Sequence, residues 1–192
     1  MSELEFHSDW FSKNIPVWEK YLGHLEGIAN LNALEIGSWE GRSAIWTMQN
    51  ILTGEGCRMT CIDSFQGNPE NTLEGYEKSV PEILRNNIKV TGLVGKVTII
   101  NQQSRIALRT FPENSFDLIY IDGSHDPKDV LTDIVFCWHL LKKFGVLILD
   151  DYGANDPMTG TCPRIGIDAF YYVFGKELIE QHRDWQIIWR KI

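Results

Sequence analysis

Short apolar runs alternate with amphipathic stretches through the first half of the chain. The apolar run 31–36 is followed by residues 42–52, in which apolar side chains recur at the spacing of one helix face. Residues 57–62 and 97–100 are further short runs rich in strand-forming residues, and Pro81 opens a stretch with helical spacing between them. This order predicts a strand, a helix, a strand, a helix and a strand in succession.

The second half of the chain continues the alternation. Residues 116–121 form a nearly unbroken apolar run, which is typical of a strand covered by helices on both faces of its sheet. Asp126 and Pro127 supply an N-cap and a first-turn residue for a helix whose apolar face extends to Leu141. Residues 146–149 then predict another buried strand.

The two ends of the chain predict smaller elements. A helix is expected from about Asn14, within an N-terminal helical cap that we assign to residues 1–30. Another helix runs through residues 169–174. Two short runs, 177–180 and 185–189, lie close enough in sequence to form a hairpin.

Strands that alternate with helices in this way imply an α/β fold, in which helices cover both faces of a mostly parallel sheet as three layers. The 192 residues fit one domain whose core needs no disulfides, so we treat 1–192 as a single domain. The polar stretch 65–80 differs in composition from the rest of the chain and is a candidate lid.

Composition disfavours several classes of function. A formal charge of −8 and a pI near 5.1 argue against a nucleic-acid-binding protein, because phosphate contacts need clustered Lys and Arg. No stretch approaches the roughly 18 uninterrupted apolar residues that span a bilayer, and the first residues lack the pattern of a secretory signal. The four cysteines have no paired CxxC spacing, which suits buried thiols in a reducing cytoplasm. We expect a cytoplasmic protein with a small-molecule partner and no membrane or nucleic-acid partner, while homo-oligomer formation stays open.

A turn with two glycines follows the first predicted strand, where open α/β sheets place their ligands. Gly37 permits a ligand to approach the backbone, and Gly41 permits the start of the next helix to do so. Asp63 ends the next strand and could accept both hydroxyl groups of a ribose, which suits any adenosine cofactor. A turn that binds nothing and an acid that caps a helix are the alternative interpretations.

Three segments resemble motifs of class I S-adenosylmethionine (SAM) dependent methyltransferases. Glu35-x-Gly37-x-x-x-Gly41 looks like the first motif of that family and lacks the closely spaced glycine pair of dinucleotide-binding turns. FDLIYIDGSH at 116–125 and LLKKFGVLILDDY at 140–152 look like the motifs of its fourth and fifth strands. The resemblance covers the chain from about residue 31 to its end, and it points to the group that includes cephalosporin-biosynthesis and macrolide-sugar O-methyltransferases, with catechol O-methyltransferase more distant.

The resemblance implies a Rossmann-like three-layer sandwich with a mostly parallel seven-stranded sheet and a C-terminal antiparallel hairpin. It also implies which residues would bind SAM. They are Glu35, Gly37, Ser38 and Gly41 at the amino acid end, Asp63 at the ribose, Gln103 and Ser104 at the adenine, and Asp122 beside the amino acid end. Family members often have an acid at the position of Gln103, whose side-chain carbonyl could replace it as acceptor for the adenine amine.

Asp122, Asp150 and Asp151 end two neighbouring predicted strands, so their carboxylates would repel one another unless a cation joined them. Mg²⁺ or another hard divalent cation prefers such oxygen ligands, and the resembling O-methyltransferases have Asp, Glu or Asn at matching positions. A bound cation would lower the pKa of an acceptor hydroxyl. The alternative is that Asp122 contacts SAM in a metal-free enzyme and Asp151 caps a loop.

A methyl acceptor must also lose a proton. His125 lies three residues after Asp122, where the pattern of the catechol enzyme has a lysine, and imidazole titrates in the useful range. His125 and Asp122 are therefore the predicted catalytic residues, with His125 as the base. A helix-terminal His125 that bonds to Asp126 or to the backbone is the alternative.

Together these features predict SAM-dependent methyl transfer to a small-molecule acceptor, at a hydroxyl oxygen and with a divalent metal. Metal-independent N- or O-methyl transfer and a non-catalytic SAM- or nucleotide-binding protein are the alternatives that the sequence leaves open. The motifs do not specify the acceptor, because the segments that would cover it, 1–30, 65–80 and 152–163, are those that vary with function in such folds.

Overall fold

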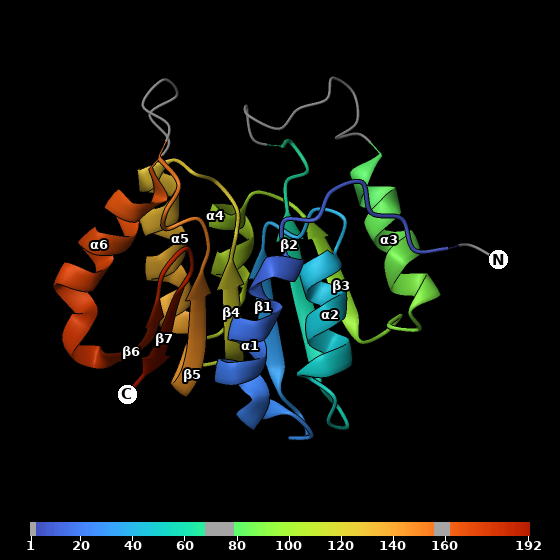
Figure 1. Ribbon diagram of the computed structural model, residues 1–192, viewed down its shortest axis with the longest axis horizontal. Helices are drawn as coiled ribbons and strands as arrows, with labels where there is room; N and C mark the ends of the chain where they lie inside the picture. Colours follow the sequence, from blue (N-terminus) through green and yellow to red (C-terminus); the bar gives the residue numbers. More distant parts are fainter. Residues whose placement is uncertain (1–2, 68–78, 156–161) are drawn as a thin grey trace.

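The computed structural model describes residues 3–67, 79–155 and 162–192, so most of the candidate lid lies outside the described residues. Helices and strands alternate along the chain as the apolar pattern predicts (Figure 1). The strands are β1 (Asn32–Ile36), β2 (Arg58–Asp63), β3 (Val97–Asn101), β4 (Phe116–Ile121), β5 (Leu141–Leu149), β6 (Leu178–Arg183) and β7 (Ile187–Lys191). The α-helices are α1 (Ile15–Leu22), α2 (Arg42–Asn50), α3 (Val80–Val90), α4 (Ser104–Ala107), α5 (Pro127–Leu140) and α6 (Pro163–Phe174).

The described strands form one seven-stranded sheet in the order β3-β2-β1-β4-β5-β7-β6. Strands β1 to β5 pair in parallel, whereas β7 pairs antiparallel with both β5 and β6. These pairings confirm the α/β class, the mostly parallel sheet and the C-terminal antiparallel hairpin. The strand order reverses between β1 and β4, so the connections that follow these two strands diverge and leave a crevice at their carboxyl ends.

Successive side chains of the strands point to two hydrophobic cores, one on each face of the sheet. In β4, Leu118 and Tyr120 belong to one core, and Ile119 and Ile121 belong to the other. Helices α1, α2 and α3 close the first core, and α4, α5 and α6 close the second; Figure 1 shows α1 and α2 in front of the sheet and α4 and α5 behind it. Each fully buried aliphatic side chain contributes roughly 1.5–3 kcal/mol, so β4 is held firmly at the centre of the molecule.

Element boundaries differ from the expected ones in several places. β5 begins at Leu141 rather than at residue 146, because Lys142, Lys143 and Gly145 interrupt the apolar run inside a continuous strand. α6 begins at Pro163, earlier than expected, and both strands of the hairpin begin and end further along the chain than their apolar runs. The single turn α4 was not expected, because four residues are too few to show a helical period.

Residues 3–11, here called the N-terminal strap, form no regular helix or strand, so the predicted helical cap is helical only from Ser12. Two buried polar side chains hold the strap against the start of α2 and against α3. The Asn87 amide donates to the Glu5 carbonyl (2.8 Å) and accepts from the Glu5 amide (2.9 Å). The Glu40 carboxylate accepts from the His7 backbone amide (2.9 Å) and lies 2.8 Å from His7 Nδ1. These contacts tie the beginning of the chain to the glycine turn.

The turn after β1 approaches the turn after β4 without a side chain between them. Gly37 has a φ of +83°, and a Cβ added there would lie 1.9 Å from the backbone oxygen of Asp122. The parallel ladder continues through this contact, because the Asp122 amide donates to the Ile36 carbonyl (2.8 Å). The glycine is therefore required for packing of the protein itself, before any ligand is considered.

We predict that Gly37→Ala destabilises the fold by about 2–5 kcal/mol, the sum of left-handed backbone strain and a clash with immobile backbone atoms. Gly92→Ala is the matched control, because Gly92 also has a positive φ (+71°) but no atom lies within 4 Å of its added Cβ. Its cost should be only about 1–2 kcal/mol. Urea denaturation measures the free energy of unfolding of both variants. An equal loss of stability in the two would show that the contact between Gly37 and Asp122 is not tight.

Candidate functional site

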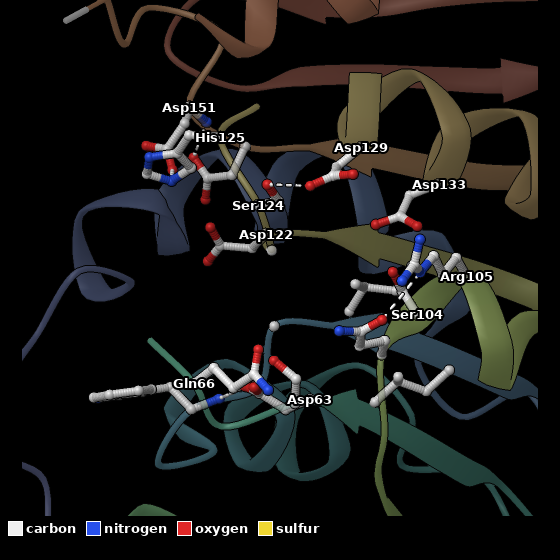
Figure 2. A pocket seen from close by; sticks show the side chains of 18 of the residues that line it. Asp63, Gln66, Ser104, Arg105, Asp122, Ser124, His125, Asp129, Asp133 and Asp151 are labelled. Carbon is white, nitrogen blue, oxygen red and sulfur yellow. Dashed lines mark hydrogen bonds and ion pairs between the residues drawn. The ribbon is translucent and has the colours of Figure 1, made fainter. Parts of the chain in front are cut away.

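A cavity of about 940 Å³ opens at the carboxyl ends of the parallel strands (Figure 2). Ligand pockets typically measure roughly 300–1,000 Å³, so this one has room for a large cofactor together with a small second ligand. The described residues that line it include six carboxylates and three permanently charged cations: Asp63, Asp122, Asp129, Asp133, Asp150, Asp151, Lys13, Arg105 and Arg109. The excess of carboxylates favours a ligand that carries positive charge.

The glycine turn contributes one predicted residue to the cavity wall directly. Gly37 lines the cavity, whereas Glu35, Ser38 and Gly41 are not among the described residues that line it. Glu35 is fully buried beneath the turn, and its carboxylate accepts hydrogen bonds from the hydroxyls of Ser38 (3.1 Å) and Ser43. The residues around Glu35 therefore hold the turn in place from inside the protein.

Burial raises the pKa of Glu35 to about 7, while the hydrogen bonds from Ser43 and Ser38 act in the opposite direction. The carboxyl group therefore titrates near neutrality in the folded protein and near its ordinary value of 4.5 in the unfolded chain. Between these two values the folded state binds more protons than the unfolded state. Stability from this group is consequently present at low pH and lost as the pH rises through that window.

Asp63 lies at the end of β2 and is aimed into the cavity by the backbone around it (Figure 2). Its carboxylate accepts from the amides of Trp39 (2.8 Å) and Phe65 (2.7 Å), both of which adopt a positive φ. Burial raises the pKa of Asp63, and these amide hydrogen bonds oppose the rise. Since a carboxylate has about four acceptor positions, these amides leave acceptor capacity for ligand hydroxyl groups.

The predicted adenine residues Gln103 and Ser104 line the cavity beyond Asp63, at the start of α4. The side-chain carbonyl of Gln103 accepts from Arg105 Nε at 3.0 Å. Asp133 on α5 lines the same end of the cavity and was not predicted from the sequence. Its position between the apolar residues Val130 and Ile134 was the available signal, because a solvated acid would not stand on a buried helix face.

The predicted metal residues Asp122 and Asp150 are joined by a protein side chain. The hydroxyl of Tyr120 lies 2.8 Å from Asp122 Oδ2 and in hydrogen-bond contact with Asp150. Asp150 also accepts from the amide of Asp151 (2.7 Å) and from Gln186 Nε2 (2.6 Å). Burial, followed by the charges of Asp150 and Asp151, raises the pKa of Asp122 well above its ordinary value.

Asp151 pairs with the predicted base. Its carboxylate lies 2.8 Å from His125 Nε2 and accepts from the Trp185 indole at 3.1 Å. Burial would raise the pKa of Asp151, but the hydrogen bond and charge of His125 outweigh it, so the pKa is lowered. Figure 2 shows His125 and Asp151 together, away from Ser104, Arg105 and Asp133.

The structure does not show the metal site expected at Asp122, Asp150 and Asp151, which stays a prediction. Across residues 3–67, 79–155 and 162–192, no group of three or more His, Cys, Asp or Glu side chains is placed to hold a metal ion. Each oxygen of Asp150 and of Asp151 has a hydrogen-bond donor of the protein beside it. Tyr120, Gln186, Trp185 and His125 thereby offset part of the repulsion expected among these carboxylates.

Aromatic residues surround the end of the cavity near His125. Trp10 from the N-terminal strap, Trp39 from the glycine turn and Trp185 from the β6–β7 connection all line it, together with Lys13. The Trp10 and Trp39 rings lie 6.3 Å apart, and Lys13 Nζ lies 4.9 Å from the Trp185 ring centre. The sequence did not point to these residues as one site, because they come from segments distant in the chain.

Two other sequence expectations concern the whole chain. Cys57, Cys61 and Cys137 are buried free thiols, as expected, while Cys162 is partly exposed. None of the helices in the described ranges has the length and apolar character needed to cross a membrane.

Comparison with known proteins adds an independent observation. The family described as a methyltransferase domain matches residues 34–152, which span β1 to the end of β5. An uncharacterized protein of Acanthamoeba polyphaga mimivirus is 28% identical over 139 residues, which cover 67% of this chain and 57% of that protein. The chain thus spans little more than half the length of this relative.

Solved structures with the same fold are more distant in sequence. A candidate caffeoyl-CoA O-methyltransferase from Staphylococcus aureus has a TM-score of 0.68 at 14% identity, over 96% of this chain and 86% of that one. An O-methyltransferase from Bacillus cereus, solved in complex with SAH, has a TM-score of 0.61 at 22% identity, over 98% of this chain and 84% of that one. At these identities the similarity shows the fold.

We predict that Glu35→Gln flattens the pH dependence of stability. The native protein should lose up to about 3 kcal/mol between pH 5 and pH 8 through the pKa shift of this group, and the variant should lose markedly less. Urea denaturation across that range measures the slope, and Glu55→Gln, at an exposed site, is the control. Parallel slopes in all three proteins would mean that Glu35 is not protonated on folding.

Proposed function

The chain belongs to the class I SAM-dependent methyltransferase family, and on that premise we propose that it transfers a methyl group from SAM to a hydroxyl oxygen of a small molecule. The observation that carries the proposal is Asp63, a partly buried carboxylate held by two backbone amides at the end of β2, beside a glycine turn. This arrangement suits an adenosine ribose. The acidic cavity around it suits a ligand with a sulfonium and an ammonium group.

The cavity residues fit the parts of SAM in a fixed order. The amino acid end would lie along the wall formed by Gly37 and near Asp122, whose raised pKa an ammonium group would lower. The ribose would bond to Asp63, and the adenine would extend toward Ser104. When bound, SAM supplies an activated methyl group and a neutral thioether as leaving group.

The residues around His125 suit the acceptor. His125 would take the proton from the acceptor hydroxyl, and Asp151, 2.8 Å from Nε2, would stabilise the resulting imidazolium. Trp10, Trp185 and Lys13 would cover the acceptor and exclude water from it. In this proposal His125 is the base, and no step requires a metal ion.

We predict that isothermal titration calorimetry will show binding of S-adenosylhomocysteine and none of NAD. Asp63→Ala should weaken the binding of S-adenosylhomocysteine by roughly 10- to 150-fold. This range corresponds to lost charge-assisted hydrogen bonds worth about 1.5–3 kcal/mol. Asp150→Asn is the control, since it removes a charge from the same cavity away from the ribose. Melting curves identify any variant that is unfolded.

Two outcomes would contradict the proposal. If NAD binds and S-adenosylhomocysteine does not, the cavity takes another cofactor. If Asp63→Ala folds and binds S-adenosylhomocysteine as tightly as the native protein does, the ribose does not lie at the end of β2.

We predict that His125→Ala slows methyl transfer by about 10²–10⁴-fold at neutral pH while leaving S-adenosylhomocysteine affinity unchanged, the usual range for a lost general base. Formation of S-adenosylhomocysteine in a screen of hydroxylated small molecules identifies the acceptor and then measures the rate. His182→Ala is the control, because His182 lies against Tyr21 and is not among the described residues of the cavity wall. An unaltered rate and pH profile in the His125 variant would exclude it as the base.

A further inference from the structure

Asp133 is a buried acid that the proposed methyl transfer does not use. It projects from α5 into the cavity at the end formed by Ser104 and Arg105, and only 4% of the residue is exposed (Figure 2). Burial raises the pKa of Asp133 to about 6, a hydrogen bond from Ser104 lowers it, and the charge of Asp129 raises it further. The carboxyl group is therefore largely ionised at neutral pH although it is buried.

Helix packing alone does not account for an acid at this position. Val130 and Cys137, one turn before and one turn after Asp133 on the same face of α5, both belong to the hydrophobic core. An apolar residue of similar size would pack there without the free energy of desolvating a carboxylate. A buried acid in a cavity wall, retained at a cost in stability, is a candidate for ligand recognition.

The position of Asp133 matches the end of the cavity at which a purine would lie. With the ribose at Asp63, the attached base extends toward the start of α4, where Ser104 and Asp133 are in contact. The sequence assigned the adenine amine to Gln103, but the carbonyl of that side chain already accepts from Arg105 Nε. An ionised carboxylate, which only accepts hydrogen bonds, is the complementary group for an amine that only donates.

We propose that Asp133 accepts a hydrogen bond from the exocyclic amino group of adenine and thereby makes the cofactor site specific for adenosine. The proposal rests on the proposed function, because it takes the cofactor to be SAM. A deaminated cofactor carries a carbonyl oxygen at the same position of the purine ring. At a pH well above 6 that oxygen would face an ionised carboxylate with no proton between them, so the two would repel each other.

Calorimetry with two ligands tests this inference without an acceptor or any turnover. At pH 8, two pH units above the pKa of Asp133, the native protein should bind S-adenosylhomocysteine about 100-fold more tightly than S-inosylhomocysteine, its deaminated analogue, because protonating the carboxylate to bond the carbonyl oxygen costs about that factor. Asp133→Asn should weaken S-adenosylhomocysteine and strengthen S-inosylhomocysteine, because an amide can donate to the carbonyl oxygen. The preference should fall at least about tenfold.

Asp129→Asn is the matched control, since Asp129 lies one turn earlier on α5, lines the same cavity and bonds to Ser124 at 3.0 Å. It should keep the native preference. A purely structural role for Asp133 would weaken both ligands together and leave their ratio unchanged, so the ratio is the decisive quantity.

The outcomes separate this inference from the function beneath it. If the native protein binds neither ligand, the SAM assignment fails with it. If the native protein binds S-adenosylhomocysteine but binds the inosine analogue equally well, Asp133 does not select adenine. The proposed methyl transfer would still stand in that case. An unchanged ratio in a folded Asp133→Asn variant has the same meaning. If that variant does not fold, equal binding of the two ligands by the native protein still overturns the inference.

Discussion

The contact between Gly37 and the backbone of Asp122 is the constraint on which the site depends. Because no Cβ stands between them, the turn after β1 and the turn after β4 meet at the point where the strand order reverses. This contact places Asp122 beside the glycine turn and fixes where the cavity begins. The buried Glu35, bonded to Ser38 and Ser43, supports the same turn from below, so the wall is held from both sides.

Concentrated negative charge is the second organising feature of the molecule. Asp63, Asp122 and Asp150 are partly buried, and desolvation raises the pKa of each of their carboxyl groups. The protein supplies hydrogen-bond donors, namely the backbone amides at Asp63, the Tyr120 hydroxyl between Asp122 and Asp150, and the Gln186 amide at Asp150. Those donors compensate the desolvation in part, and a cationic cofactor would add the favourable charge that the cavity lacks.

The strands, their alternation with helices and the carboxyl-end location of the site could be predicted from the sequence. Buried parallel strands appear as unbroken apolar runs, and residues 116–121 form β4 without any change of boundary. Side-chain partners could not be predicted in this way. Nothing in the spacing of Asp150 and Asp151 reveals whether they will face an ion or face Gln186 and His125, since that depends on rotamers and on distant segments.

Two further residues show the same limit. His7 reaches Glu40 across 33 positions of the chain, and such a contact leaves no local period in the sequence. Asp133 was not singled out in the sequence, although its apolar neighbours mark that face of α5 as buried. Sequence patterns thus located the cavity, and tertiary packing decided which polar groups enter it.

The most direct test of this account is a crystal structure of the protein with S-adenosylhomocysteine. We expect the ribose hydroxyl groups to bond to Asp63, the homocysteine end to lie beside Gly37 and Asp122, and the adenine to lie next to Ser104. Electron density for the ligand outside the cavity at the carboxyl ends of β1, β2 and β4, or with the ribose away from Asp63, would contradict it.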